Sequence, residues 1–529
     1  MSEPADGQPA PQTVDYASKP TASGRTYGST AIRGAKLFTV AAIASRFVSL
    51  GSQLLLGVLL LPSDFKLWAL VLGCVAIFAV LRESSIHRVL ISRADDFDRL
   101  ARPALYLLVG SNLVAIVLIA ALSPIFAWFY DEPKLTWLLL AMCAAMLVGL
   151  GNPVYQTRVS LNLNFGYMAL VATVATLARG SMMVLVAWIW RSPMCFVVGF
   201  GTSLLVEAIM YRYRAGKLPK TDEPVLGPIV EILRDGSWIV LGSVATAIVL
   251  QGDYLVIGWM AGGDDDGDLL GFYNFGFQIA LAFGTMLLGS LRRLLAPTYR
   301  NFIDDPVRLK SAVSRSIKLL TLMAGVTGCL MAVVASSALT FVWGEKWQAS
   351  IIVVQAISFA TVTRSLPVIG NALLEAKGKW ALRAALLTAD AVGTLLAAYV
   401  GCLLGGLFTL AIIVGAYRFI VGIVVTVVCL RAMNVSPGIF YRAAFGPILI
   451  CGAASVLTLM LDYGVMFEWP SFWRMVLTSL VFLGLTTAGL ALFMPARLKE
   501  LIAVLGRQKK DRTDDDDPQD DRNSALAAD

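Results

Sequence analysis

The sequence predicts an all-α integral membrane protein of about fourteen transmembrane helices, arranged as two parallel six-helix lobes and a C-terminal helix pair. Hydrophobic residues make up 57% of the chain and charged residues only 15%, with a mean hydropathy of +0.72. A soluble domain carries about a quarter charged residues. Apolar runs of about twenty residues recur along the chain, the length that crosses the ~30 Å hydrocarbon core of a bilayer.

Breaks by charge, Gly or Pro separate these runs and define the expected organisation. We expect spans near 37–61, 67–91, 104–126, 135–157, 166–190, 193–213, 236–261, 269–296, 317–343, 349–374, 380–403, 406–430, 442–462 and 472–494. The corresponding domains are a disordered cytoplasmic tail (1–36), an N-terminal lobe (37–213), a cytoplasmic linker (214–235), a C-terminal lobe (236–430), an extra helix pair (431–494) and an acidic cytoplasmic tail (495–529).

The distribution of Lys and Arg predicts the orientation. With a cytoplasmic start, 33 of the 43 basic residues fall on the inner side, five lie outside and five lie within spans. An excess of basic residues in cytoplasmic loops is the rule for multi-pass proteins. We therefore expect a multi-pass protein of the bacterial inner membrane with both termini in the cytoplasm.

A weak internal repeat supports the division into halves. Residues 65–90 align with residues 270–295 without gaps, which places Trp68 on Tyr273 and Arg88 on Arg293. Both halves begin on the inner side, so the two lobes are predicted to be parallel repeats, and transporters often bind substrate between such repeats.

Five arginines lie well inside apolar runs, where each costs about 2.5–3.5 kcal/mol on insertion scales. They are Arg46, Arg82, Arg179, Arg364 and Arg418. Facing a water-filled cavity would offset this cost, and a cationic cavity would attract an anionic substrate such as a phosphate or pyrophosphate. Snorkelling to the interface or pairing with a carboxylate is the alternative for each of them.

Two aspartates also lie inside predicted spans, Asp253 in the seventh and Asp390 in the eleventh. An isolated carboxylate at such a depth is able to titrate or to bind a cation, which would couple transport to protons or sodium. A permanent ion pair with an arginine of the opposite half is the alternative.

Several function classes are disfavoured. The seven cysteines lie in apolar runs without CxxC spacing, and only one histidine is present, so neither a metal site nor a catalytic constellation is expected. No GxxxxGK[ST] phosphate loop occurs. We expect no cofactor, no enzymatic activity and no nucleic-acid partner.

Tryptophans cluster near the predicted outer boundary, where they are expected to anchor the helices at the membrane interface. They are Trp128, Trp137, Trp188, Trp190, Trp343, Trp347, Trp469 and Trp473.

Three stretches carry a family resemblance: LLLPSDFKLWAL (59–70), GDYLVIGWMAG with LLGFYNFGFQIA and LAPTYRNFIDDPVRLKSAVSRSIKLL (252–320), and FVWGEKWQASIIVVQAISFATVTRSLPVIGNALLEAKGK (341–379). They resemble Wzx-type oligosaccharide flippases, in the superfamily that also contains MATE exporters and the peptidoglycan lipid flippase. Lys66 and Gly252 depart from the family pattern, in which a glycine and an asparagine are common.

The resemblance implies a MATE-like fold and alternating access around a central cationic cavity. It implies transfer of an undecaprenyl-diphosphate-linked oligosaccharide to the outer leaflet for exopolysaccharide, capsule or O-antigen assembly. Arg46, Arg82 and Arg364, with Arg292 and Arg293 nearer the inner face, would then hold the pyrophosphate and acidic sugars, and Asp253 or Asp390 would sense ions. The implied partners are the lipid-linked oligosaccharide, membrane lipid, and a polysaccharide polymerase and co-polymerase.

Two other functions compete with this one. A MATE-like exporter of small cations would prefer a cavity rich in carboxylates, whereas arginines outnumber aspartates inside the predicted spans. A non-transporting scaffold of a polysaccharide-assembly complex would use the two tails as docking segments.

Overall fold

The computed structural model describes residues 45, 47–78, 90, 96–162, 164–218, 226–261, 268–282, 295, 299, 302, 305–466 and 468–495. Within these ranges all regular secondary structure is helical, as predicted, and ten helical stretches are long and apolar enough to cross a membrane. Two shorter apolar helices cover Phe47–Leu59 and Leu269–Ala282. The N-terminal tail and all but the first residue of the acidic tail lie outside the described residues.

The chain divides into two compact units. The first comprises Met1–Leu60 and Cys74–Val244, and the second comprises Leu61–Gly73 and Ala245–Asp529. Two helices continue from one unit into the other, namely α2 (Pro62–Ile77) and α10 (Leu226–Met260). The start of α10 at Leu226 lies inside the stretch that the sequence predicted as a linker.

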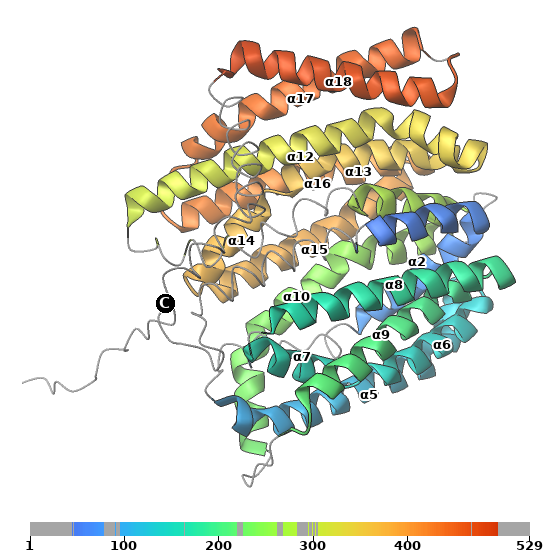
Figure 1. Cartoon of the computed structure of the whole chain (residues 1–529), viewed down its shortest axis with the longest axis vertical. Helices are drawn as coiled ribbons and strands as arrows, with labels where there is room; N and C mark the ends of the chain where they lie inside the picture. The colour runs from blue at the N-terminus through green and yellow to red at the C-terminus, as the bar shows by residue number, and fades with distance from the viewer. Residues whose placement is uncertain are drawn as a thin grey trace, which may run out of the picture. The chain divides into compact units, whose positions relative to one another are not determined.

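The first unit is a bundle of long helices that lie alongside one another (Figure 1). It contains α5 (Phe97–Phe129), α6 (Lys134–Val148), α7 (Asn152–Leu161), α8 (Phe165–Trp190) and α9 (Met194–Ala215). Helix α9 packs against both α8 and α6.

The predicted span 135–157 is broken in the structure into α6 and α7. Gly151 has φ of +85°, a left-handed conformation that glycine adopts without steric cost, and Pro153 occupies the first turn of α7. The break has a local cause. Proline has no backbone N–H, so Pro153 cannot make the hydrogen bond that would continue the helix through this position.

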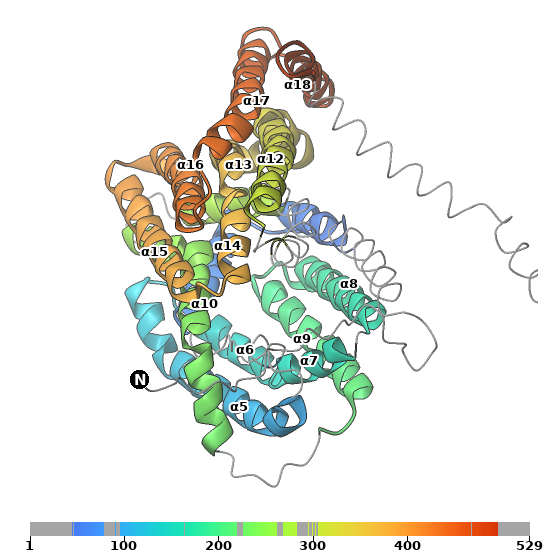
Figure 2. The same cartoon turned by 90° about the vertical axis from the view of Figure 1, so that its left-hand side faces the viewer.

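The second unit contains most of the remaining helices. They are α12 (Pro306–Trp343), the 3-10 helix η2 (Gly344–Ser350), α13 (Ile351–Arg364), α14 (Pro367–Ala376), α15 (Trp380–Leu403), α16 (Gly406–Ala432), α17 (Gly438–Gly464) and α18 (Ser471–Phe493). Helix α16 packs on α13 and α15, and α12 packs on α13, α17 and α18. Figures 1 and 2 both show α17 and α18 side by side next to α12.

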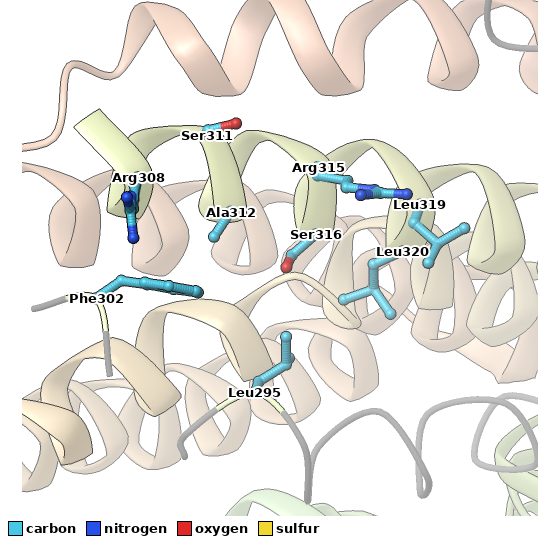
Figure 3. Close-up of a pocket in the computed structure, with 9 residues that line it drawn as sticks. All are labelled: Leu295, Phe302, Arg308, Ser311, Ala312, Arg315, Ser316, Leu319 and Leu320. Carbon is cyan, nitrogen blue, oxygen red and sulfur yellow. The ribbon is translucent and has the colours of Figure 1, made fainter. Parts of the chain in front are cut away.

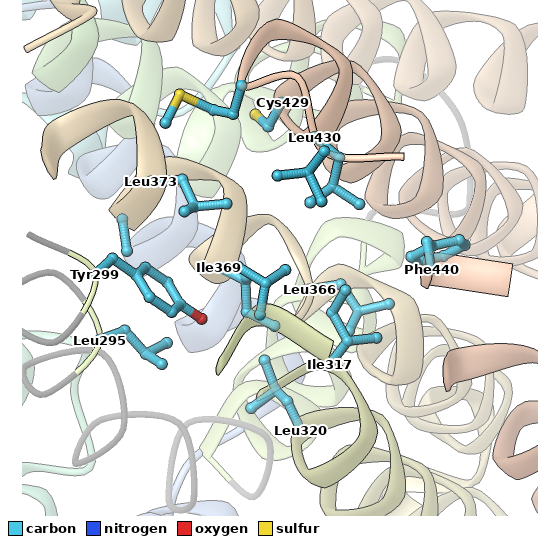
Figure 4. Packing of buried hydrophobic residues seen from close by; sticks show 14 of the residues in the cluster. Leu295, Tyr299, Ile317, Leu320, Leu366, Ile369, Leu373, Cys429, Leu430 and Phe440 are labelled. Atoms are coloured by element: carbon cyan, nitrogen blue, oxygen red, sulfur yellow. The ribbon is translucent and has the colours of Figure 1, made fainter. Parts of the chain in front are cut away.

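An apolar cluster joins α12, α14, α16 and α17 at one end of the second unit (Figure 4). Leu309, Val313 and Ile317 recur every fourth residue of α12 and are all buried against it. This spacing places them on one face of the helix.

Helices α17 and α18 form a hairpin that is joined by a buried ion pair. Arg474 Nε and Nη2 donate to the two carboxylate oxygens of Asp462 at 2.5 and 2.7 Å. A bidentate pair of this kind fixes orientation as well as supplying energy.

Large apolar side chains remain exposed along most helices, as expected where the surroundings are lipid. Trp128, Trp137 and Trp188 are 81%, 72% and 69% exposed, which suits anchoring at an interface. Trp347 does not fit this interpretation, because its side chain is 0% exposed. The prediction was wrong for Trp347, which belongs instead to a buried aromatic cluster.

Candidate functional site: a buried ionic cluster

Asp253 is the most deeply buried carboxylate of the predicted site. It lies on α10 with 0% exposure and accepts hydrogen bonds from Tyr273 Oη at 2.8 Å and from Arg418 Nη2 at 3.1 Å. The backbone N–H of Tyr254 donates to its other oxygen at 3.1 Å. A buried charge requires such partners, because without them its desolvation would cost several kcal/mol.

Arg418 on α16 is the counter-ion of Asp253 and is itself buried. Its Nη2 also donates to the carbonyl oxygen of Val249 at 3.1 Å. The guanidinium lies over the ring of Phe277, 4.7 Å from the ring centroid, within the range of a cation–π interaction. Three kinds of contact therefore hold this arginine in one place.

Asp390 on α15 forms a second ion pair, with Arg364. The distance from Arg364 Nη2 to Asp390 Oδ2 is 2.6 Å. Tyr417 Oη donates to the carbonyl oxygen of Asp390 at 3.0 Å and lies 3.2 Å from Oδ1. The Arg364 side chain is 24% exposed, whereas Asp253, Asp390 and Arg418 are all buried.

Arg364 lies at a break in the helical chain. It is the last residue of α13, and α14 begins three residues later at Pro367. The C-terminus of a helix carries partial negative charge, which favours a cation there. Thr363 Oγ1 donates to the carbonyl oxygen of Phe419 at 2.7 Å and ties this end of α13 to α16.

A glycine allows α16 to approach this break. A methyl group added at Gly422 would lie 2.5 Å from the carbonyl oxygen of Thr363 and 2.8 Å from the amide nitrogen of Arg364. These are backbone atoms, which have little freedom to move away. Gly422 is therefore part of the structure that positions Arg364.

The two ion pairs are joined through consecutive residues of α16. Tyr417 contacts Asp390, and the adjacent Arg418 contacts Asp253. Arg418 also interacts electrostatically with Asp390. The cluster thus contains two carboxylates and two guanidinium groups, and its formal charge is zero.

The structure accordingly brings together four of the nine residues that the sequence singled out, namely Asp253, Asp390, Arg364 and Arg418. All four belong to the second unit. The sequence left open an ion pair between each aspartate and an arginine of the opposite half. Both aspartates do form ion pairs, but their partners lie in the same unit, so the predicted partners were wrong.

Of the remaining predicted residues, Arg179 lies within the described part of the chain. Arg179 lies on α8 in the first unit, with its guanidinium 6.0 Å from the Phe200 ring centroid, and it interacts electrostatically with Glu207. Arg46, Arg82, Arg292 and Arg293 lie outside the described residues. Within the described part of the chain, no group of three or more His, Cys, Asp or Glu side chains is placed to hold a metal ion.

Sequence reasoning missed the two tyrosines of the cluster. Tyr417 had a detectable signal, because it immediately precedes an intramembrane arginine. Tyr273 was noted only as the repeat partner of Trp68, and nothing in its neighbourhood indicated a contact with Asp253 twenty residues earlier.

A buried aromatic cluster connects the three stretches that carry the family resemblance. Phe65 comes from the first stretch, Phe275 from the second and Trp347 from the third. The Trp347 ring stacks on Phe275 with centroids 3.8 Å apart, and Phe65 meets both rings edge to face at 5.1 and 5.2 Å. Segments far apart in sequence thus share one packing unit.

Comparison with known families also groups these three segments together. A family model described as polysaccharide biosynthesis protein matches residues 55–352, more than half of the chain. The chain belongs to the polysaccharide biosynthesis protein family. The matched range contains all three aromatic residues of the cluster and Asp253, whereas Arg364, Asp390 and Arg418 follow it.

Two curated relatives of this family member are similar over about two thirds of its length. The lipopolysaccharide biosynthesis protein WzxC of Escherichia coli (strain K12) is 23% identical over 350 residues, 66% of this chain and 70% of the relative. The teichuronic acid biosynthesis protein TuaB of Bacillus subtilis (strain 168) is 20% identical over 349 residues, 65% of this chain and 71% of the relative. These matches confirm the resemblance to Wzx-type flippases.

Solved structures share the fold. The lipid II flippase MurJ in an inward closed conformation superposes with a TM-score of 0.70 at 11% identity, covering 87% of this chain and 99% of that one. The Vibrio cholerae MATE transporter VcmN gives a TM-score of 0.55 at 10% identity, with 78% and 98% covered. Together with the ten apolar helices, these matches identify a MATE-like, multi-pass membrane protein.

Proposed function

We propose that this family member is a flippase that moves an undecaprenyl-diphosphate-linked oligosaccharide from the inner to the outer leaflet of the bacterial inner membrane. The observation that carries the proposal is the combination of a polysaccharide biosynthesis family match with the fold of a lipid II flippase over 87% of the chain. The product would serve exopolysaccharide, capsule or O-antigen assembly, alongside a polymerase and co-polymerase. The protein would act as a secondary transporter and not as an enzyme.

We further propose fourteen spans with both termini in the cytoplasm. The stretch Pro306–Ala376 is 71 residues long and contains α12, α13 and α14. At 1.5 Å per residue it is long enough to cross the ~30 Å core twice. Counted in this way, the ten stretches supply eleven spans, and α2 with the helices Phe47–Leu59 and Leu269–Ala282 would supply the other three. Two six-helix lobes and a final hairpin are the arrangement this count supports.

The substrate diphosphate would be held by arginines of the cavity. Of the described arginines, Arg364 is the best candidate, because it is partly exposed and ends a helix, so its side chain is able to exchange Asp390 for another anion. Arg46, Arg82, Arg292 and Arg293 remain candidates from sequence. Arg418 and Arg179 would contribute less directly, since Arg418 is buried in contact with Asp253 and Arg179 interacts with Glu207.

Ion coupling is assigned to Asp390 in preference to Asp253. Asp253 accepts three hydrogen bonds at full burial, and protonating it would leave Arg418 without its counter-ion at a cost of about 3–5 kcal/mol. If Arg364 moved to a substrate phosphate, Asp390 would lose its partner and take up a proton or a cation instead. Substrate binding and ion uptake would then be linked through one arginine.

Depletion of the protein tests the proposal. We expect a lipid-linked oligosaccharide to accumulate on the inner leaflet, measured by lipid extraction and by enzymatic access from the cytoplasmic side. Complementation with the wild-type chain should clear it, and Arg364→Ala at normal protein level should not. Normal export in the depleted strain, with no such intermediate, would rule out the flippase function.

A MATE-like exporter and a scaffold give different results in the same strains. An exporter would show altered sensitivity to cationic compounds without a lipid-linked intermediate. A scaffold would tolerate Arg364→Ala, because its role would need only the folded protein.

A further inference from the structure

A cavity of about 440 Å³ lies beside the first turns of α12, apart from the ionic cluster. Figure 3 shows its lining: Leu295, Phe302, Arg308, Ser311, Ala312, Arg315, Ser316, Leu319 and Leu320. Seven of these nine residues come from α12 itself. The cavity therefore follows one face of a single helix.

The lining positions recur at the spacing of a helix face. Residues 308, 311, 312, 315, 316, 319 and 320 together cover about half of the circumference of α12, because each residue turns the helix by about 100°. The buried residues Leu309, Val313 and Ile317 belong to the apolar cluster of the second unit, and the cavity borders this cluster because Leu295 and Leu320 belong to both. The two exposed arginines lie on the rest of the lining, away from this border.

The cavity changes in character along the helix axis. Arg308, Ser311 and Arg315 lie near the start of α12, and Leu319 and Leu320 lie deeper. Eleven residues separate Arg308 from Leu319, a rise of about 16 Å. A polar, cationic end thus continues into an apolar end over about half of the ~30 Å hydrocarbon core.

The charges at the polar end favour an anion. Arg308 pairs with Asp305 at 3.2 Å, and that carboxylate also accepts hydrogen bonds from the N–H groups of residues 307 and 308. Arg315 lies two turns further along, and among the described residues no carboxylate lies within ion-pair distance of it. One guanidinium is therefore available beside the hydroxyls of Ser311 and Ser316.

The predicted topology places this end of α12 at the cytoplasmic surface of the membrane. Anionic phospholipids of that leaflet attract basic residues electrostatically. We propose that the cavity binds one anionic phospholipid of the inner leaflet, with its phosphate on Arg315 and Arg308 and an acyl chain along Leu319 and Leu295. The bound lipid would fill the open face of α12 and would be distinct from the transported substrate.

Native mass spectrometry of the full-length protein in detergent tests this proposal, with phosphatidylglycerol as the probe and phosphatidylcholine as the neutral comparison. We expect one tightly held phosphatidylglycerol, about tenfold weaker in the double variant Arg308→Gln/Arg315→Gln. The matched control Lys310→Gln/Lys318→Gln removes the same charge from the same helix at positions that do not line the cavity. It should bind as the wild type does.

A second variant tests the apolar end without altering charge. Leu319→Trp fills the deeper part of the cavity and should weaken phosphatidylglycerol binding, while size-exclusion chromatography shows that the protein stays monodisperse. Equal binding by the wild type and both cavity variants would overturn the proposal.

Two competitors identify the source of the phosphate. Inorganic phosphate that displaces phosphatidylglycerol at millimolar concentration would mean that the site recognises only an anion, which contradicts the proposal. Displacement by a polyprenyl diphosphate in the wild type, lost in Arg308→Gln/Arg315→Gln, would assign the cavity to the transported substrate and would also overturn it. Failure of both competitors to displace phosphatidylglycerol supports a phospholipid site, and the readout does not depend on export.

Discussion

Arg418 on α16 and Asp253 on α10 are 165 residues apart in the sequence, yet their side chains meet at 3.1 Å with both residues buried. Neither residue is tolerable alone at this depth, because an uncompensated charge in an apolar interior is strongly destabilising. The pair therefore explains how two costly residues persist inside two apolar helices.

Removing one partner of this pair should be worse than removing both. We expect Arg418→Met and Asp253→Asn each to destabilise the protein by about 3–5 kcal/mol, and the double variant to recover much of that loss. Thermal unfolding in detergent measures the effect, with Lys310→Gln on the exposed surface of α12 as the control. Additive losses in the double variant would show that the two side chains do not depend on each other.

Arg364 should be needed for transport more than for folding. In Arg364→Ala/Asp390→Asn both charges are absent, so we expect near-normal protein level but little export, measured as surface polysaccharide per unit of protein. Tyr417→Phe removes only a hydroxyl whose net hydrogen-bond contribution is about 1 kcal/mol, and it should keep most of the export. Full export by the double variant would exclude Arg364 from substrate contact.

Gly422 should not accept a side chain. Its added methyl group would meet the backbone of Thr363 and Arg364 at 2.5–2.8 Å, so we expect Gly422→Ala to destabilise by about 1–3 kcal/mol and to lower export by moving Arg364. Gly452→Ala on α17 is the matched control, because nothing lies within 4 Å of its added methyl group. The control should be neutral or slightly stabilising, since alanine is the better helix former. Similar melting temperatures for the two variants would contradict the packing described for α16.

The ion pair of the final hairpin should act on stability alone. We expect Arg474→Gln to lower the melting temperature, because it leaves the fully buried Asp462 without its charged partner. The exchanged variant Asp462→Arg/Arg474→Asp should recover part of that loss if the pair itself is what matters. Export normalised to protein level should change little, whereas a selective loss of export would give the hairpin a direct role in transport.

The proposed orientation is testable with single cysteines. All six buried native cysteines and the half-buried Cys402 should react slowly, which leaves a low background. Ser192→Cys, between α8 and α9, should react with a membrane-impermeant maleimide in intact cells. Ser436→Cys, between α16 and α17, should react only after permeabilisation, and the reverse pattern would invert the predicted topology.

Much of the architecture followed from sequence because it depends on local properties. The length of each apolar run reflects the thickness of the bilayer, and the ends of α8, α15 and α18 lie within a residue of the predicted spans. Boundaries were less accurate where a helix extends beyond the apolar run, as in α5 and α10, because polar turns continue the helix into water. The break between α6 and α7 depends on Gly151, whose backbone conformation a hydropathy pattern does not encode.

The sequence by itself determined that this is a helical membrane protein, which positions carry intramembrane charge, and to which family it is similar. Only the tertiary structure decided that Arg418 neutralises Asp253, that Arg364 neutralises Asp390, and that Trp347 is buried against Phe65 and Phe275. The physical reason is distance along the chain. Insertion into a bilayer is determined segment by segment, whereas the choice of partner for a buried charge or ring depends on which helices pack together.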